Sequence, residues 1–273
     1  SEMCIRDSAY TKEDSLVLLK GVRGGPWQRL GSWAVDSPRS PALWVVDGVP
    51  VAACASGSKR VAFVNASFDA REEFELPYPV RELSLAAGPE GSVLLIVSVQ
   101  YPSDGDLYAL YSPDWGESWQ GFWFDVSSSD ARWPTVLTDP RSRYFWLLYG
   151  IDSDRDGSFN LKFLLAERSE AGSRSSWGVD PETDSLALDD EEVGPVESPK
   201  PLSASLLAGE EGLLIGAVWN ASPRRVDRDV FFVHSSSPPY VEVGEESEAP
   251  RTSGVFRPGA FVPLGLPEGA RVK

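Results

Sequence analysis

The segment Tyr111–Trp119, which reads Tyr-Ser-Pro-Asp-Trp-Gly-Glu-Ser-Trp, constrains the fold more than any other part of this chain. It lies between an alternating segment, Asp106–Tyr111, and an aromatic one, Ser118–Val126, and each is typical of a β-strand. Asp114 is suited to accept backbone N–H groups, and Gly116 allows the positive φ that tight turns require. The segment therefore predicts a β-hairpin whose turn is closed by side chains.

Similar patterns of strand, turn and strand recur along the chain. Large aromatic residues mark the corresponding turns at intervals of 47, 45, 58 and 63 residues, which is the spacing of four-stranded propeller blades. We predict an all-β chain, a β-propeller of four-stranded antiparallel blades, with four recognisable blades and partial blades at both ends. The aromatic residues are Trp27, Phe74, Trp119, Trp177 and Tyr240. The four blades are expected at Pro41–Phe74, Glu82–Val126, Trp133–Trp177 and Leu202–Val243, and the partial ones at Ser15–Val35 and Val255–Val262.

The central turn resembles the Asp-box of the sialidase-type (BNR-repeat) β-propellers. All five signature positions of that box are filled, by Ser112, Asp114, Gly116, Ser118 and Trp119. In this family the box is structural. The resemblance therefore implies that Asp114 holds a turn together and is not a catalytic acid.

An imperfect copy of the box precedes the complete one. Ser67, Asp69 and Phe74 keep its spacing, but Arg71 stands where the glycine belongs. A side chain at that position predicts a turn that is distorted or differently wound.

The ends of the chain and one insert need separate treatment. Residues 1–8 resemble a translated sequencing adapter fused to a fragmentary metagenomic gene, and we set them aside. Residues 9–273 are expected to form a single propeller domain with an acidic loop at 180–199. The partial blades at the ends either pair into a fifth blade or belong to a larger propeller, and we favour the larger propeller.

Composition limits the partners. A net charge of −16 with a pI near 4.5 argues against nucleic acid as a ligand. No apolar run approaches the ~18 residues that a membrane span requires. Apart from Cys4, only Cys54 is present, so no internal disulfide is expected and Cys54 is predicted to be a small buried side chain. We expect a monomer with a glycan or protein ligand, in a secreted, periplasmic or cell-surface location.

The ligand is expected on one face of the propeller. Loops that join second to third strands, and the connections between blades, gather opposite the boxes. Arginines beside aromatic rings on this face suit sugars and carboxylates. The candidate binding residues are Arg81, Asp104, Arg132, Trp133, Arg224, Arg225, Asp227 and Arg257.

Catalysis is not supported by the residues present. Sialidases use three arginines, an Arg-Ile-Pro motif, a Tyr nucleophile paired with a Glu, and an Asp acid/base. The segment Phe256–Pro258 lacks the Ile, and no position matches the Tyr, Glu or Asp securely. We therefore expect a module that binds a glycan or protein. The alternative is a sialidase-like exo-glycosidase whose remaining catalytic residues lie in blades missing from this sequence.

One acidic run is a candidate metal site. Asp152, Asp154 and Asp156, followed by Gly157, mimic the first half of a Ca²⁺-binding loop, but the twelfth position is Phe163 instead of Glu. Ca²⁺ is the only cofactor that the sequence suggests, and a solvated acidic loop is the alternative.

Overall fold

The computed structural model describes residues 5–22, 25–68, 70–101, 104–125, 129–138, 143–152, 155, 159–178, 186–188, 200–205, 214–220 and 228–234. Apart from a single 3₁₀ turn, η1 (Arg174–Ser176), all regular structure in these residues is β-strand. The predicted all-β class is confirmed.

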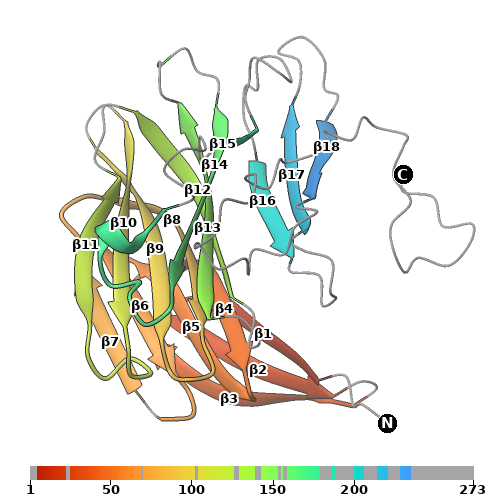
Figure 1. Ribbon diagram of the computed structural model, residues 1–273. Helices are drawn as coiled ribbons and strands as arrows, with labels where there is room; N and C mark the ends of the chain where they lie inside the picture. Colours follow the sequence, from red (N-terminus) through yellow and green to blue (C-terminus); the bar gives the residue numbers. More distant parts are fainter. Residues whose placement is uncertain are drawn as a thin grey trace, which may run out of the picture.

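The strands form five antiparallel sheets that follow one another along the chain (Figure 1). The first sheet contains β1 (Ile5–Lys12), β2 (Ser15–Val22) and β3 (Trp27–Ala34). The second contains β4 (Arg39–Val46), β5 (Val49–Ser56), β6 (Arg60–Asn65) and β7 (Ala70–Glu75), and the third β8 (Val80–Ala87), β9 (Val93–Gln100), β10 (Gly105–Ser112) and β11 (Gln120–Asp125). The fourth contains β12 (Asp130–Thr138), β13 (Tyr144–Asp152), β14 (Asn160–Glu167) and β15 (Leu186–Leu188), and the fifth β16 (Lys200–Ser205), β17 (Leu214–Asn220) and β18 (Arg228–His234).

The sheets are arranged as propeller blades. The first strands β4, β8, β12 and β16 contact one another in order, so they line the inner side of the fan of sheets seen in Figure 1. After β3, Val35 N donates to Asp14 O in the β1–β2 turn (2.9 Å). The next residue, Asp36, accepts at its O from Gly57 N in the β5–β6 turn (2.6 Å), so the β1–β2 and β5–β6 turns lie at the same end of the blades. Strands β1–β3 therefore correspond to the second, third and fourth strands of a blade.

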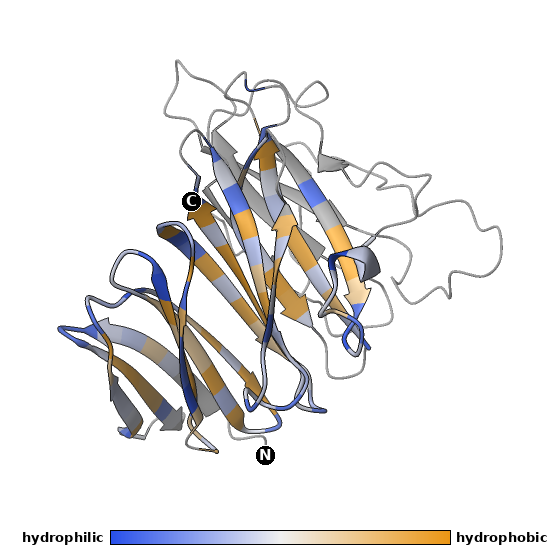
Figure 2. Ribbon diagram, turned by 90° about the vertical axis from the view of Figure 1, so that its left-hand side faces the viewer, coloured by the Kyte–Doolittle hydropathy of each residue, from blue (hydrophilic) through white to orange (hydrophobic). Residues whose placement is uncertain are grey.

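The core lies between neighbouring blades. On β9, which is almost entirely apolar and buried, Leu94 and Ile96 pack toward the fourth sheet. Leu95 and Val97 alternate with them and pack toward the second sheet. Figure 2 shows the resulting concentration of hydrophobic residues along the strands and of hydrophilic residues in the turns. The second and third blades are thus buried on both faces, and their positions depend on their neighbours.

The structure departs from the sequence predictions at two places. Leu186–Leu188 forms β15 and pairs with Leu161 and Lys162 of β14, so the expectation of a loop throughout 180–199 was wrong. Strand β1 begins at Ile5, within the segment that we set aside. The predicted strands at 240–243 and 255–262 lie outside the described residues.

The turn between β10 and β11 is closed by its own side chains. Ser112 Oγ accepts from Gly116 N (2.8 Å) and donates to Asp114 Oδ1 (2.8 Å). Asp114 also accepts from Ser118 N (2.8 Å) and Ser118 Oγ (2.5 Å). Gly116 has a φ of 96°, and a β-carbon there would lie 2.5 Å from the ring of Phe63. Both the backbone conformation and the packing therefore favour glycine at this position.

Trp119 and Trp177 occupy equivalent positions in consecutive blades. The Trp119 ring lies 5.0 Å from that of Phe74 and donates Nε1–H to Gly116 O (3.0 Å). The Trp177 ring lies 5.2 Å from that of Phe124 and donates to Ala171 O (3.1 Å). Each tryptophan thus packs on the outer strand of the preceding blade.

The other aromatic anchors are not equivalent to these two. Phe74 lies within β7 and receives the Trp119 ring, and Trp27 at the start of β3 is 51% exposed. Tyr240 lies outside the described residues. The predicted equivalence of all five rings was therefore wrong, although the blade repeat it indicated is present.

The imperfect copy at 67–74 forms a shorter turn than the complete one. Strand β7 begins at Ala70 opposite Asn65, so Arg71 lies in a strand opposite Val64. Asn65 Oδ1 accepts from Ser67 N (3.1 Å) and its Nδ2 donates to Trp115 O (3.2 Å), so this amide joins the turns of two blades. Asp69 lies outside the described residues.

No helix among the described residues is long and apolar enough to cross a membrane.

Candidate functional site

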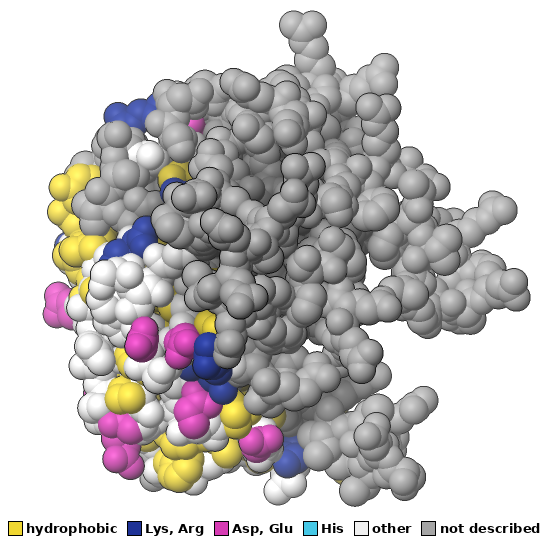
Figure 3. Space-filling model, viewed as in Figure 1, with side chains coloured by type: hydrophobic (Ala, Val, Ile, Leu, Met, Phe, Trp, Pro, Cys, Tyr) yellow, Lys and Arg dark blue, Asp and Glu magenta, His cyan; other side chains and the backbone are white. Residues whose placement is uncertain are grey.

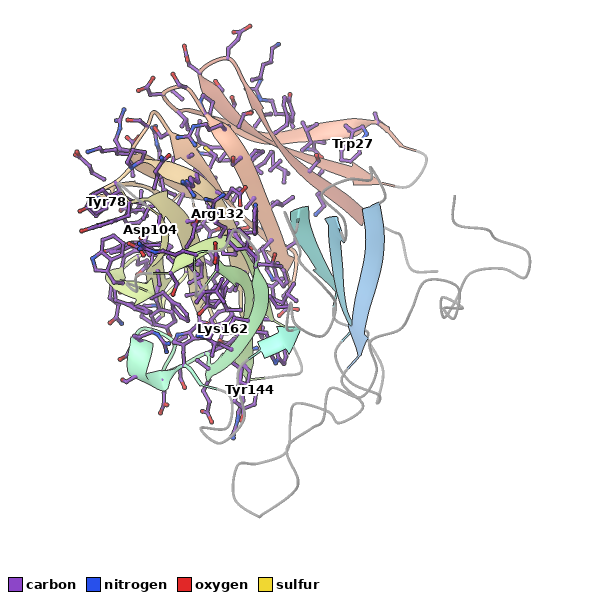
Figure 4. All side chains as sticks on the ribbon, turned by 90° about the horizontal axis from the view of Figure 1, so that it is seen from above. Trp27, Tyr78, Asp104, Arg132, Tyr144 and Lys162 are labelled. Atoms are coloured by element: carbon purple, nitrogen blue, oxygen red, sulfur yellow. The ribbon has the colours of Figure 1, made fainter. Side chains whose placement is uncertain are left out.

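The candidate site lies at the end of the blades opposite the Ser112–Trp119 turn. Strand β10 runs from Gly105 to Ser112, so the loop containing Asp104 is at the other end from that turn. The second-to-third-strand loops of the central blades and the starts of β4, β8 and β12 share this end, which we call the loop face. Figure 4 looks onto it and labels Tyr78, Asp104 and Arg132 there.

Two of the first strands, β4 and β12, begin at the loop face with the same kind of β-bulge. The segments Arg39–Pro41 and Arg132–Pro134 share the pattern Arg-x-Pro, and the β-pairing shifts at both. The central residues Ser40 and Trp133 both have a φ of 53°. A positive φ is uncommon for a residue with a side chain, especially for a bulky one, and such conformations persist where the surrounding structure imposes them.

The two arginines of these bulges have different partners. Arg39 donates from Nη1 to Val80 O (2.8 Å) and from Nη2 to Gly57 O (3.0 Å), which connects the second and third blades. Arg132 donates from Nε to Asp130 Oδ1 (2.8 Å) and from Nη2 to Asp130 Oδ2. Arg39 is therefore a structural residue, whereas Arg132 belongs to a cluster of side chains.

Asp130 is the centre of that cluster. Arg81 Nη1 lies 3.7 Å from Asp130 Oδ1, so two arginines from neighbouring blades face one carboxylate. Burial and the positive charge of Arg132 lower the pKa of Arg81, while Asp130 opposes the shift. A β-carbon at Gly105 would lie 2.6 Å from Asp130 Oδ1. Glycine at that position therefore leaves the space that the carboxylate fills.

A second ion pair lies on the same face. Arg155 Nη2 is 2.7 Å from Asp104 Oδ2, and the pair joins the loops of the third and fourth blades. The Asp104 side chain is 7% exposed and that of Arg155 is 52% exposed. The Asp104 carboxylate is thus buried, and the more exposed Arg155 guanidinium lies on its solvent side.

Aromatic rings flank the Asp130 cluster. The rings of Trp133 and Phe159 are 4.7 Å apart, and the Arg132 guanidinium carbon lies 5.8 Å and 5.3 Å from their centroids. A β-carbon at Gly150 would lie 2.9 Å from the Trp133 ring, so glycine allows the ring to lie against the strand. Trp133 remains partly exposed.

A second group of rings lies where the third blade meets the second. The ring of Tyr101, which is 38% exposed, is 4.6 Å from that of Tyr78, and Trp123 follows at 6.0 Å from Tyr78. A hydrogen bond with Tyr101, followed by burial, raises the pKa of Tyr78. The loop face thus presents two groups of aromatic rings, one where the second and third blades meet and one on the fourth blade.

The structure brings together four of the predicted binding residues, namely Arg81, Asp104, Arg132 and Trp133. Arg224, Arg225, Asp227 and Arg257 lie outside the described residues, as do Asp154 and Asp156 of the proposed Ca²⁺ loop. Asp152 is buried at the end of β13, directly opposite Asp130 in the pairing with β12. In the part of the chain that the structure describes, no group of three or more metal-ligating side chains is found.

Sequence reasoning missed Asp130, Asp106 and the role of Arg155. Asp106 is 2% exposed on β10, and Arg155 had been considered only as part of the acidic run. One signal was available. The Arg-x-Pro pattern occurs twice at the start of a predicted first strand, and Asp130 precedes the second copy by two residues.

Comparison with known proteins supports the fold. No protein-family model matches the sequence, and no curated protein matches it. Among solved structures, a polysaccharide lyase of family PL25, ulvan lyase, matches with a TM-score of 0.53 and 11% identity over 85% of this chain and 67% of the lyase. The endo-arabinase of Bacteroides thetaiotaomicron VPI-5482 matches with a TM-score of 0.44 and 13% identity over 88% and 91% of the two chains.

The subtype N10 neuraminidase-like protein of A/little yellow-shouldered bat/Guatemala/060/2010 has a TM-score of 0.43 and 10% identity over 73% of this chain and 57% of its own. At these identities only the fold is shared. The predicted resemblance to the sialidase-type β-propellers is confirmed at the level of the fold by the arrangement of the strands in successive antiparallel blades.

Proposed function

We propose that the loop face binds a glycan. The observation that carries the proposal is the pair of carboxylate–guanidinium clusters, Asp130 with Arg81 and Arg132, and Asp104 with Arg155, next to the Trp133 ring. Sugar hydroxyls both donate and accept hydrogen bonds, so they are matched by carboxylates and guanidinium groups together. The apolar face of a sugar ring packs on an aromatic side chain.

The cluster is also held rigidly. Asp130 and Arg132 lie on strand β12 at a bulge, and Asp104 is fixed between two blades by Arg155. A binding site on strands, with its side chains paired, loses little conformational entropy when a ligand binds. A glycan ligand also fits the expected secreted, periplasmic or cell-surface location. Ulvan lyase, which shares the fold, has been solved bound to -[GlcA(1-4)Rha3S]-.

Two tryptophan variants test the proposal. Trp133 on the loop face and Trp115 in the opposite turn both have a positive φ, 53° and 59°, so Trp133→Ala and Trp115→Ala are matched in backbone conformation. We expect the wild-type protein to bind oligosaccharides on a glycan array. Calorimetry should show that Trp133→Ala lowers the affinity for the best ligand about tenfold or more, the equivalent of about 1.4 kcal/mol. Trp115→Ala should leave that affinity unchanged. Failure to bind any glycan, or equal losses in both variants, would refute the proposal.

Glycoside hydrolysis is a second candidate, because several carboxylates meet at this end. Asp130 and Asp152 are directly opposite each other on β12 and β13, and Asp104 lies at the start of the neighbouring β10. Most glycosidases use two carboxyl groups roughly 5 to 10 Å apart. The test is turnover of a panel of aryl glycosides, including a fluorogenic sialoside. Turnover that Asp130→Asn abolishes would establish the hydrolase, whereas binding without turnover supports the binding module.

A further inference from the structure

The charges of the loop face are already balanced within the protein. Arg132 places both Nε and Nη2 on Asp130, Arg81 faces the same carboxylate at 3.7 Å, and Arg155 contacts Asp104 at 2.7 Å. The buried carboxylates Asp106 and Asp152 lie at the same end. Among these side chains, three arginines stand against four aspartates, which leaves no excess of positive charge around Asp130 and Asp104.

A carboxylated sugar would have to compete with these internal carboxylates. A guanidinium binds a carboxylate best through two parallel hydrogen bonds, and Asp130 already uses that edge of Arg132. Displacing Asp130, whose side chain is 14% exposed, would leave a mostly buried carboxylate without its partner. That desolvation cost opposes any gain from the new pair.

The charge of the whole protein acts in the same direction. With a net charge of −16, the long-range potential repels an anionic ligand. On the side of the molecule that Figure 3 shows, the described surface carries acidic side chains and a few scattered basic ones. A neutral sugar meets neither obstacle, because its hydroxyls can bond to paired carboxylates and guanidinium groups without separating them.

We infer that the loop face selects neutral sugars and discriminates against carboxylated ones. This inference rests on the proposed glycan-binding function and specifies its ligand class. It separates this chain from ulvan lyase, whose bound fragment contains glucuronate.

The test compares acidic oligosaccharides with their carboxyl-reduced counterparts, which differ only in the charged group. Calorimetry should show at least about tenfold tighter binding of the neutral member. The affinity for that member should stay constant between about 50 and about 500 mM NaCl, because no net charge is neutralised. Tighter binding of the acidic members, weakened by salt, would overturn the inference and leave glycan binding intact. Absence of binding to every member would refute the proposed function itself.

An Asp130→Asn variant tests the cause of the selectivity. It removes the carboxylate that Arg81 and Arg132 face, so the acidic member should gain at least about tenfold in affinity relative to the wild-type protein. Glu167→Gln makes the same charge change at the opposite end of the blade, where Glu167 pairs with the exposed Arg143 at 3.1 Å, and should leave both affinities unchanged. Circular dichroism would confirm that both variants are folded. An equal gain in both variants, or none in a folded Asp130→Asn protein, would contradict the explanation.

Discussion

The carboxylate of Asp104 and the guanidinium of Arg155 lie 2.7 Å apart, although they belong to different blades. Their loops join second to third strands in the third and fourth blades, so the pair fixes the distance between two neighbouring loops of the candidate site. The geometry of the loop face therefore depends on contacts between blades as much as on any one hairpin.

This pair should contribute to stability more than an exposed pair does. Arg155→Met leaves the buried Asp104 carboxylate without its guanidinium partner and should lower the free energy of unfolding by about 1–2 kcal/mol. The control is Arg60→Met, which removes the pairs of the 39% exposed Arg60 with Asp36 and Glu73, whose side chains are 60% and 31% exposed, and should cost about 1 kcal/mol or less. Urea denaturation measures both. Equal losses would show that burial of Asp104 has no consequence.

Asp114 should stabilise its turn in a pH-dependent way. Burial alone would raise its pKa, but the hydrogen bonds from Ser118 and Ser112 outweigh that effect and lower it. A folded-state pKa below the unfolded value of about 3.9 means that the contribution is fully present above that pH and is lost as the pH falls through the folded pKa. Asp114→Asn should cost about 1–3 kcal/mol at neutral pH, because an amide has one acceptor oxygen instead of two.

Denaturation curves at neutral pH and at a pH of about 2 check this prediction. The difference in free energy of unfolding between wild type and Asp114→Asn should shrink as the pH falls, because the wild-type carboxylate becomes protonated as the pH passes its lowered pKa. Pro113→Ala, at an exposed position of the same turn, should behave like the wild type. If the difference in free energy of unfolding between wild type and Asp114→Asn stays constant with pH, the role assigned to the Asp114 carboxylate is contradicted.

Glu90 and Arg168 connect the third and fourth blades at the end opposite the site. Arg168 donates from Nε to Glu90 Oε1 (2.7 Å) and from Nη1 to Thr138 Oγ1 (3.1 Å), and its side chain is 9% exposed. Glu90→Gln should lower the melting temperature clearly, with a loss of about 1–3 kcal/mol, because the buried guanidinium loses its counter-ion. Glu167→Gln, which affects the exposed pair with Arg143, should cost under about 1 kcal/mol. Similar melting temperatures for the two variants would refute the interpretation.

Cys54 should be unreactive in the folded protein. Burial, and to a lesser extent the charge of Glu73, raises the pKa of Cys54 to about 12, so almost no thiolate forms at neutral pH. In a Cys4→Ser variant, where Cys54 is the only thiol, an aromatic disulfide reagent at a pH of about 8 should react only after denaturant is added. Rapid reaction of the native variant would show that β5 opens locally.

The sequence predicts the repeated part of the fold well, because the physical signals are local. Within the predicted unit Pro41–Phe74, strand β5 (Val49–Ser56) forms because an apolar run follows the Asp47-Gly48 turn. Strand β15 was missed because Leu186–Leu188 is too short to show a period, and only the edge of β14 makes it a strand. Local patterns identify hairpins, whereas isolated edge strands depend on the sheet that they join.

The candidate site was only partly predictable, for a related reason. The rule that second-to-third-strand loops and the connections between blades share one face predicted Asp104, Arg81 and Arg132 at one end, and the structure brings them together there. The convergence of two arginines on Asp130 depends on the bulge at Arg132–Pro134 and on the space beside Gly105, neither of which has a local sequence period. Charge pairing across blades is a property of the packed structure.

A crystal structure of the protein with its best-binding oligosaccharide tests the central claim most directly. We predict that the sugar lies on the loop face, with a ring against Trp133 and hydroxyls bonded to Asp130 and Arg132. A sugar bound at the opposite end of the blades, beside Trp115, would contradict the account.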